Sequence, residues 1–182
     1  MYSSEGKNLR EKLGFLFDVL KRYDHYVATT NFKVALMLSF LGVIILGLIT
    51  RIASIAPTQS GCNYIYFLTI TSSVLTIILS IISAINLLRV VFPNTDTHDG
   101  DKSLIFFGDV ATCGGGETGY AEKVKDVTDE DLVEDLSKQT YIVAKIINEK
   151  FRVLKIAVKM TIYGVIPLFA ISLLLLVFEG IK

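Results

Sequence analysis

The 182-residue chain is poor in the residues from which most catalytic and metal sites are built. It has two cysteines, two histidines, three prolines and no tryptophan. His25 and His98 complete no Cys/His spacing of the kind that a zinc site needs. The sequence also shows no Ser/His/Asp set, no Cys beside a His and no carboxylate pair in a recognisable setting. We therefore expect a protein that is not an enzyme, with no metal and no cofactor.

An excess of charge of one sign is also lacking, because 18 basic residues balance 18 acidic ones. Nothing in this balance suggests nucleic-acid binding. Apolar residues, in contrast, make up 52% of the chain, mean hydropathy is +0.54, and the apolar residues form long runs. A helix needs about 20 mainly apolar residues to cross a bilayer. Three runs meet that need: Val34–Ile55, with Arg51 as its one charge, Tyr64–Ala84 and Met160–Phe178.

These runs predict an all-α membrane protein with three transmembrane helices, helical cytoplasmic extensions and a small loop or short-strand insert. The first run is interpreted as a retained span, because acids and bases are mixed before it and it is too long for the core of an export signal. The predicted segments are an N-terminal amphipathic cytoplasmic helix (1–32), the first span (33–56), an outer link (57–63), the second span with a cytoplasmic extension (64–92), a cytoplasmic sensing region (93–157) and the third span (158–180).

The positions of Lys and Arg predict the orientation. Six basic residues precede the first span and ten lie between the second and third, whereas Arg51 and Lys182 are the other two. Because basic residues gather on the cytoplasmic side, the N-terminus is expected in the cytoplasm and the C-terminus outside. This topology places Cys62 and Cys113 on opposite sides of the membrane, where they cannot pair within one chain.

Apolar residues before the first span recur at helical spacing and form one stripe. Two explanations fit: the helix lies on the lipid surface, or it packs against the cytoplasmic ends of its neighbours. The balanced charge of its other face favours packing. The stripe consists of Leu9, Leu13, Leu16, Leu20, Tyr23 and Val27.

The predicted sensing region begins with a polar, turn-rich stretch, Asn94–Gly100. Leu104–Phe107 is a short apolar segment that periodicity assigns equally well to a strand or to an ordered loop. Cys113–Gly119 holds three consecutive glycines, yet it matches neither the Walker pattern nor the dinucleotide fingerprint. We interpret it as a flexible connector rather than a phosphate cradle.

The last long helix is predicted to begin at Thr128, since Thr128–Asp131 has the outline of a capping box. The helix continues into the third span past Gly164 and Pro167, where a kink is expected. Gln139 and Lys150 interrupt its apolar stripe. Lys150 could snorkel to water or pair with a nearby acid such as Asp131, Asp135 or Glu149. Alternatively, Arg89, Lys145, Lys150 and Arg152 could meet a phosphate, with Gln139 reading a base edge; anionic lipid would satisfy the same cations.

Several short segments occur in an order that resembles a known family. They are Asn31-Phe-Lys33, Ser83–Arg89, Phe92-Pro93, Ser103–Gly108, Tyr120, Asp131-Leu132, Asp135-Leu136, Gln139 and Lys145–Lys150. Together they resemble the membrane effector of Pycsar, the bacterial pyrimidine-cyclase anti-phage system. The resemblance implies an effector in the bacterial inner membrane that senses cCMP or cUMP from a partner cyclase and impairs the membrane, causing abortive infection.

The residues hypothesised to bind this nucleotide are Arg89, Phe107, Gly108, Gln139, Lys145 and Lys150. Two other functions stay open, namely a membrane interaction protein without a small ligand and a constitutive pore-forming toxin. Serine and threonine hydroxyls along the second span suit close helix approach, including approach between subunits of a homo-oligomer. These are Ser72, Ser73, Thr76, Ser80 and Ser83.

Overall fold

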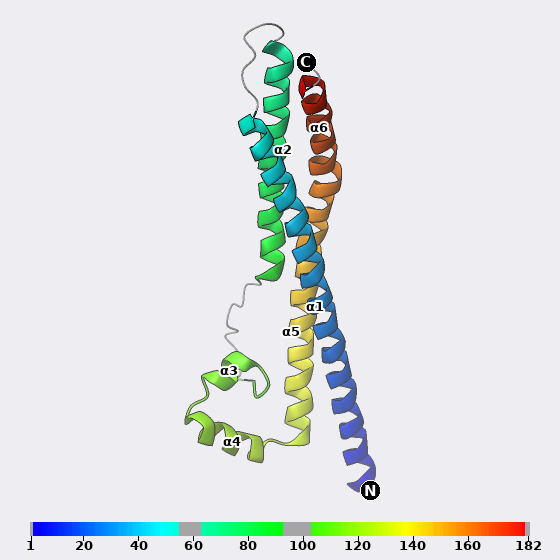
Figure 1. Ribbon diagram of the computed structural model, residues 1–182. Helices are drawn as coiled ribbons and strands as arrows, with labels where there is room; N and C mark the ends of the chain where they lie inside the picture. The colour runs from blue at the N-terminus through cyan, green and yellow to red at the C-terminus, as the bar shows by residue number, and fades with distance from the viewer. Residues whose placement is uncertain (1, 55–62, 93–102, 181–182) are drawn as a thin grey trace. The chain divides into compact units, whose positions relative to one another are not determined.

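The computed structural model describes residues 2–54, 63–92 and 103–180, and within them it is helical with no strand (Figure 1). This confirms the all-α fold class. The elements are α1 (Tyr2–Ser54), α2 (Asn63–Val91), α3 (Phe107–Ala111), α4 (Gly116–Asp126), α5 (Asp129–Met160), the π-helical segment η1 (Thr161–Val165) and α6 (Ile166–Gly180). Residues 57–62 of the predicted outer link, Cys62 and the stretch Asn94–Gly100 lie outside the described residues.

Three helical stretches are long and apolar enough to cross a membrane: α1, α2, and the continuous run of α5, η1 and α6. The second ends at Val91, two residues before Pro93, whose ring and missing N–H forbid further regular helix. The strand alternative for Leu104–Phe107 is wrong, because residues 104–106 form no strand and α3 begins at Phe107.

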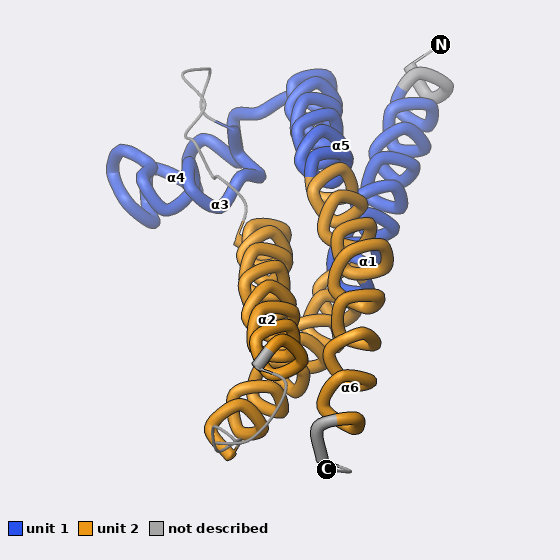
Figure 2. The backbone as a smooth tube through the Cα atoms, turned by 90° about the horizontal axis from the view of Figure 1, so that it is seen from above, with its two compact units in different colours: residues 1–29, 94–149 blue, residues 30–93, 150–182 orange. Residues whose placement is uncertain are grey.

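The chain forms two compact units (Figure 2). Residues 1–29 and 94–149, here called the polar unit, contain the start of α1, the helices α3 and α4, and most of α5. Residues 30–93 and 150–182, here called the membrane unit, contain the rest of α1, α2, the end of α5, η1 and α6. The two longest helices therefore contribute to both units.

The membrane unit has a small core and a largely apolar exterior. Its buried apolar side chains include Val34 and Leu41 of α1, Leu87 of α2, and Val165 and Leu176 of the third stretch. Large apolar side chains are nevertheless exposed on every one of these helices. Such exposure would be costly in water, but lipid solvates apolar side chains as well as a protein interior does.

A row of buried hydroxyls on α2 faces the third stretch. Ser72 and Thr76 each lie 3.2 Å, oxygen to oxygen, from the Ser172 hydroxyl of α6, and Ser83 lies 2.8 Å from the Thr161 hydroxyl of η1. Because later residues of α2 meet earlier residues of the other stretch, the two run antiparallel, as Figure 1 shows. We call this contact the hydroxyl seam; its buried members are Thr69, Ser72, Ser73, Thr76, Ser80, Ser83, Thr161 and Ser172.

The irregularity expected near Gly164 and Pro167 takes the form of the π-helical segment. The N–H of Ile166 donates to the carbonyl of Thr161, five residues back. Pro167 has no N–H to offer the preceding turn, which removes one regular helical bond at this point. A Cβ at Gly164 would lie 2.5 Å from Leu79 Cδ2, so glycine here permits the close approach of α2.

The hydroxyl seam predicts energetic coupling between Ser83 and Thr161. We expect the single changes Ser83→Ala and Thr161→Val to interact by about 0.6 kcal/mol, the typical strength of a hydrogen bond between membrane helices. A double-mutant cycle on unfolding in mixed detergent measures this term. Thr71→Val, an exposed position on α2, is the matched control and should show no coupling with Thr161→Val. Equal coupling in both cycles would contradict the assignment.

Candidate functional site

One carboxylate of α5 holds the segment that leads into α3. Asp135 Oδ2 accepts hydrogen bonds from the Leu104 N–H at 2.8 Å and from the Ser103 hydroxyl at 3.1 Å. Ser103 is buried, whereas Asp135 is half-buried. Hydrogen bonds to a charged acceptor are stronger than neutral ones, so this contact fixes a segment that lies 31 and 32 residues away along the chain.

Ser103 also orders the residues that follow it. Its hydroxyl oxygen accepts from the N–H groups of Ile105 and Phe106, both at 3.0 Å, and its own N–H donates to Asp109 Oδ2 at 3.0 Å. Serine side chains commonly accept hydrogen bonds in this way from backbone N–H groups two and three residues further along the chain.

Tyr120 of α4 adds a second attachment, since its hydroxyl donates to the Leu104 carbonyl at 3.0 Å. The α3 and α4 segments are thus tied to one another and to α5 inside the polar unit. We call this set the Ser103 knot; its members are Ser103, Leu104, Asp109, Tyr120 and Asp135.

The knot presents an aromatic side chain to solvent. Phe107, the first residue of α3, is 72% exposed, and its ring lies 4.8 Å from the Phe106 ring, centroid to centroid, at an angle of 50°. A Cβ at the next residue, Gly108, would meet the Phe106 ring at 2.7 Å. The predicted ligand residues Phe107 and Gly108 are therefore held by ordered neighbours, with one aromatic face free.

The glycine run builds a tight turn rather than a flexible connector. Gly115 and Gly116 adopt φ values of +83° and +60°, in the left-handed region that side chains disfavour. A Cβ at Gly119 would collide with the carbonyl oxygen of Gly114. The connector interpretation is wrong from Gly116 onward, because α4 begins there.

Thr128 caps α5 as predicted. Its hydroxyl donates to Asp131 Oδ2 at 2.6 Å, and the Asp131 N–H donates back to the Thr128 hydroxyl oxygen at 3.2 Å. The hydrogen bonds from the Thr128 side chain and backbone hold the pKa of the Asp131 carboxyl below its ordinary value. The aspartate in the fourth place therefore completes the reciprocal capping box that glutamate or glutamine usually forms.

The helix α5 separates two of the predicted ligand residues. Gln139 is half-buried and lies one turn after Asp135, on the face that holds the Ser103 knot. Lys145 is exposed and, six residues further on, points about 120° away around the helix. Within the polar unit, Phe107, Gly108 and Gln139 thus belong to or adjoin the knot, whereas Lys145 does not share that face.

Arg89 and Lys150 belong to the membrane unit. Arg89 is exposed in the last turn of α2. Lys150 of α5 is only 8% exposed, and burial lowers the pKa of its amine. Pairing of Lys150 with Asp131, Asp135 or Glu149 stays a prediction, because these acids belong to the polar unit and Lys150 to the membrane unit.

Sequence reasoning missed the structural centre of the polar unit. Asp135 was considered as a partner for Lys150 and, like Ser103, as part of the family resemblance, whereas Asp109 received no role. The signal that the sequence offered was local: a serine hydroxyl commonly binds backbone N–H groups two or three residues further along the chain. No group of three or more His, Cys, Asp or Glu side chains in the described part of the chain is placed to hold a metal.

These features are those of a multi-pass helical membrane protein with a separately packed polar unit. A family model described as the Pycsar effector protein domain, PycTM, matches residues 15–177, and the chain belongs to that family. The Escherichia coli Pycsar effector protein EcPycTM is 28% identical over 149 residues, 78% of this chain and 78% of its own length. No solved structure matches the chain.

The Ser103 knot predicts that Asp135→Ala releases residues 103–107. Each hydrogen bond to a charged group contributes about 1.5–3 kcal/mol, so amide exchange at Leu104 should rise by at least about tenfold. Hydrogen exchange read by mass spectrometry on the intact protein measures this change. Glu134→Ala, which removes only the exposed Lys138–Glu134 pair, should leave Leu104 protected. Unchanged exchange in Asp135→Ala would refute the anchoring role.

Proposed function

We propose that this chain senses a cyclic pyrimidine mononucleotide, cCMP or cUMP, made by a cognate cyclase, and then impairs the bacterial inner membrane, causing abortive infection. Membership of the Pycsar effector family makes it an anti-phage defence effector with a cyclase partner and a membrane association. The observation that carries the proposal is the reach of the family match, which includes both the apolar helices and the helices α3 to α5.

The polar unit offers chemistry suited to a base. An exposed aromatic ring can stack on a pyrimidine, and Phe107 presents one on a segment that is already ordered. The Gln139 amide can donate to and accept from the polar edge of a base. Lys145, Arg89 and Lys150 stay predictions as contacts for the cyclic phosphate.

Sensing requires a ligand that discriminates between two states of the protein. A shift from 1:99 to 99:1 needs about 5.5 kcal/mol of differential binding. One stacked base supplies about 1–3 kcal/mol, and charge-assisted contacts to a phosphate supply a comparable amount. A single mononucleotide is therefore sufficient only if its base and its phosphate are both bound more tightly in the active state than in the resting state.

The proposed location is the inner membrane, with the N-terminus in the cytoplasm and the C-terminus in the periplasm. Sixteen of the 18 basic residues lie before the first span or between the second and third, which supports this orientation. It places the polar unit in the cytoplasm, where a cyclase would release its product. The proposed effector acts without catalysis, through a change in the membrane-embedded helices.

The decisive experiment titrates the purified full chain with cCMP, cUMP, cAMP and cGMP. Thermal stability in detergent reports binding, and dye release from liposomes reports membrane damage. We expect a pyrimidine nucleotide to raise the melting temperature and to trigger release. No response to any of the four would overturn the sensing proposal and favour a ligand-independent interaction protein. Full release without nucleotide would favour a constitutive pore-forming toxin.

Phe107 provides the sharpest test of base stacking. Phe107→Ala should weaken nucleotide affinity by about 5- to 150-fold, the equivalent of one lost stacking contact. Tyr141→Ala is the matched control, because Tyr141 is 70% exposed in the same unit and lies on α5 outside the knot. Isothermal titration compares the two variants. Equal affinity in both would remove Phe107 from the binding site.

Lys150 can be tested without reversing a buried charge. Lys150→Met keeps an unbranched side chain of similar length and removes the amine. The variant should therefore fold and, if Lys150 binds the phosphate, lose at least about tenfold in nucleotide affinity. Lys155→Met, at an exposed position on the same helix, is the control. An unchanged affinity would assign Lys150 a structural role.

A further inference from the structure

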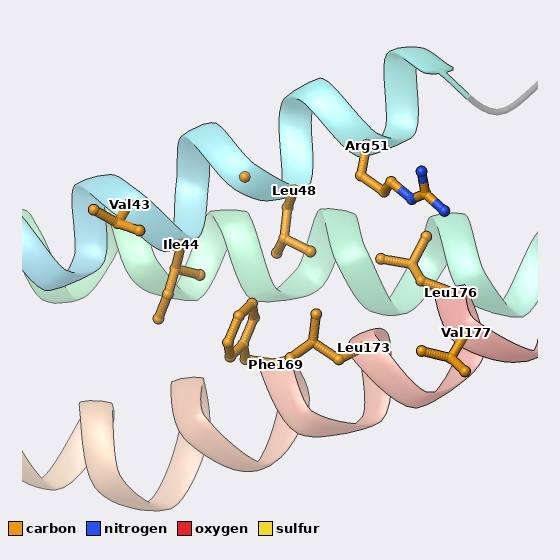
Figure 3. A pocket seen from close by; sticks show the side chains of 9 residues that line it. Val43, Ile44, Leu48, Arg51, Phe169, Leu173, Leu176 and Val177 are labelled. Carbon is orange, nitrogen blue, oxygen red and sulfur yellow. The ribbon is translucent and has the colours of Figure 1, made fainter. Parts of the chain in front are cut away.

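The membrane unit contains an open groove between α1 and α6 that ends at a cation. The groove has a volume of about 570 Å³, and Figure 3 shows its lining side chains in two facing rows. The α1 row includes Val43, Ile44 and Leu48, and the α6 row includes Phe169 and Leu173. All of these side chains are apolar, so the interior of the groove has no affinity for water.

The length of the groove matches one leaflet of a bilayer. Val43 and Arg51 are eight residues apart on α1, which corresponds to roughly 12 Å along the helix axis. One leaflet of a hydrocarbon core that is about 30 Å thick is only slightly deeper than this. The groove is thus long enough for an acyl chain that enters from the headgroup level, and too short for a path across the membrane.

Gly47 keeps the middle of the groove open. It lines the groove, and a Cβ placed on it would meet nothing within 4 Å. The residues on either side of it in the lining, Val43, Ile44 and Leu48, are all large. A large side chain at this position would project into the space without disturbing the packed core.

Arg51 stands at the end of the groove, in the last turn of α1. Figure 3 shows its guanidinium group beside Leu176. Arg51 is exposed and is the one charged residue between Val34 and Ile55. Among the described side chains no carboxylate pairs with it. A cation in this position, at the end of a span, faces the phosphates of a bilayer.

We propose that this groove binds an anionic phospholipid, with one acyl chain between α1 and α6 and the phosphate on Arg51. A guanidinium group binds phosphate through two parallel hydrogen bonds, which gives the headgroup a fixed place. Arg51 offers a cation to the phosphate of the headgroup, and the adjoining apolar groove offers a surface to the acyl chain. The site is separate from nucleotide sensing and stands whether or not the chain binds a nucleotide.

The experiment measures binding of short-chain lipids to the full protein in detergent. Dioctanoyl-phosphatidylglycerol should bind more tightly than dioctanoyl-phosphatidylcholine, whose phosphate is neutralised by its own choline. Arg51→Gln should weaken phosphatidylglycerol binding by at least about tenfold and should abolish the preference between the two lipids. Gly47→Leu should weaken binding of both lipids, because it fills the groove.

Gly42→Leu is the matched control for the groove, since a Cβ at Gly42 also meets nothing within 4 Å but Gly42 is not part of the lining. It should bind both lipids as the unchanged protein does. Inorganic phosphate should bind weakly or not at all, because it lacks the acyl chain.

Three outcomes would overturn the proposal: an Arg51→Gln variant that keeps its lipid preference, equal loss of binding in the Gly47 and Gly42 variants, or inorganic phosphate that competes as well as the lipid. Circular dichroism and size-exclusion chromatography confirm that each variant is folded. The nucleotide titration, run on the same samples, distinguishes a failure of this site from a failure of nucleotide sensing.

Discussion

The structure depends on one constraint: inside hydrocarbon, every backbone N–H and C=O must find its partner within the protein. Continuous helices satisfy this demand, and α1 runs without a break for 53 residues from the polar unit into the membrane unit. The third stretch stays helical even past a proline, because a π-helical segment accommodates the missing hydrogen bond. Because hydrocarbon also solvates apolar groups, large apolar side chains can remain on the exterior of the membrane unit.

Hydrocarbon also changes what holds the helices of the membrane unit together. Apolar contacts discriminate little between a neighbouring helix and lipid, so small side chains and hydrogen bonds decide which faces meet. The hydroxyl seam uses both: serine and threonine allow close approach, and the hydroxyls of Thr76, Ser80 and Ser83 bind a carbonyl of their own helix or reach across to Ser172 and Thr161. The polar unit, in contrast, is organised by a charged group, Asp135, at its centre.

Features that depend on local sequence were predictable, and features that depend on distant contacts were not. The three apolar stretches, the end of α2 before Pro93 and the Thr128 cap follow from run length and from capping chemistry, which act over a few residues. Asp135 acquires its role only when the fold brings Ser103 to it. The glycine run looked like a connector because its composition does not reveal that Gly119 must approach Gly114 closely. The sequence showed that Gln139 interrupts the apolar stripe of the last long helix. The structure adds that Gln139 lies one turn after Asp135, the residue of α5 that holds the Ser103 knot.

The apolar parts of the three membrane-crossing stretches carry no formal charge: Val34–Thr50, Tyr64–Leu88 and Met160–Phe178 contain no Asp, Glu, Lys or Arg. The membrane potential does work of about 2.3 kcal/mol per 100 mV on each elementary charge that crosses the bilayer. A sliding or tilting motion confined to these segments moves no charge through that field. Voltage therefore acts in such a rearrangement only on the partial charges at the helix ends, so a chemical event at those ends, where the charged residues lie, is the better source of its energy.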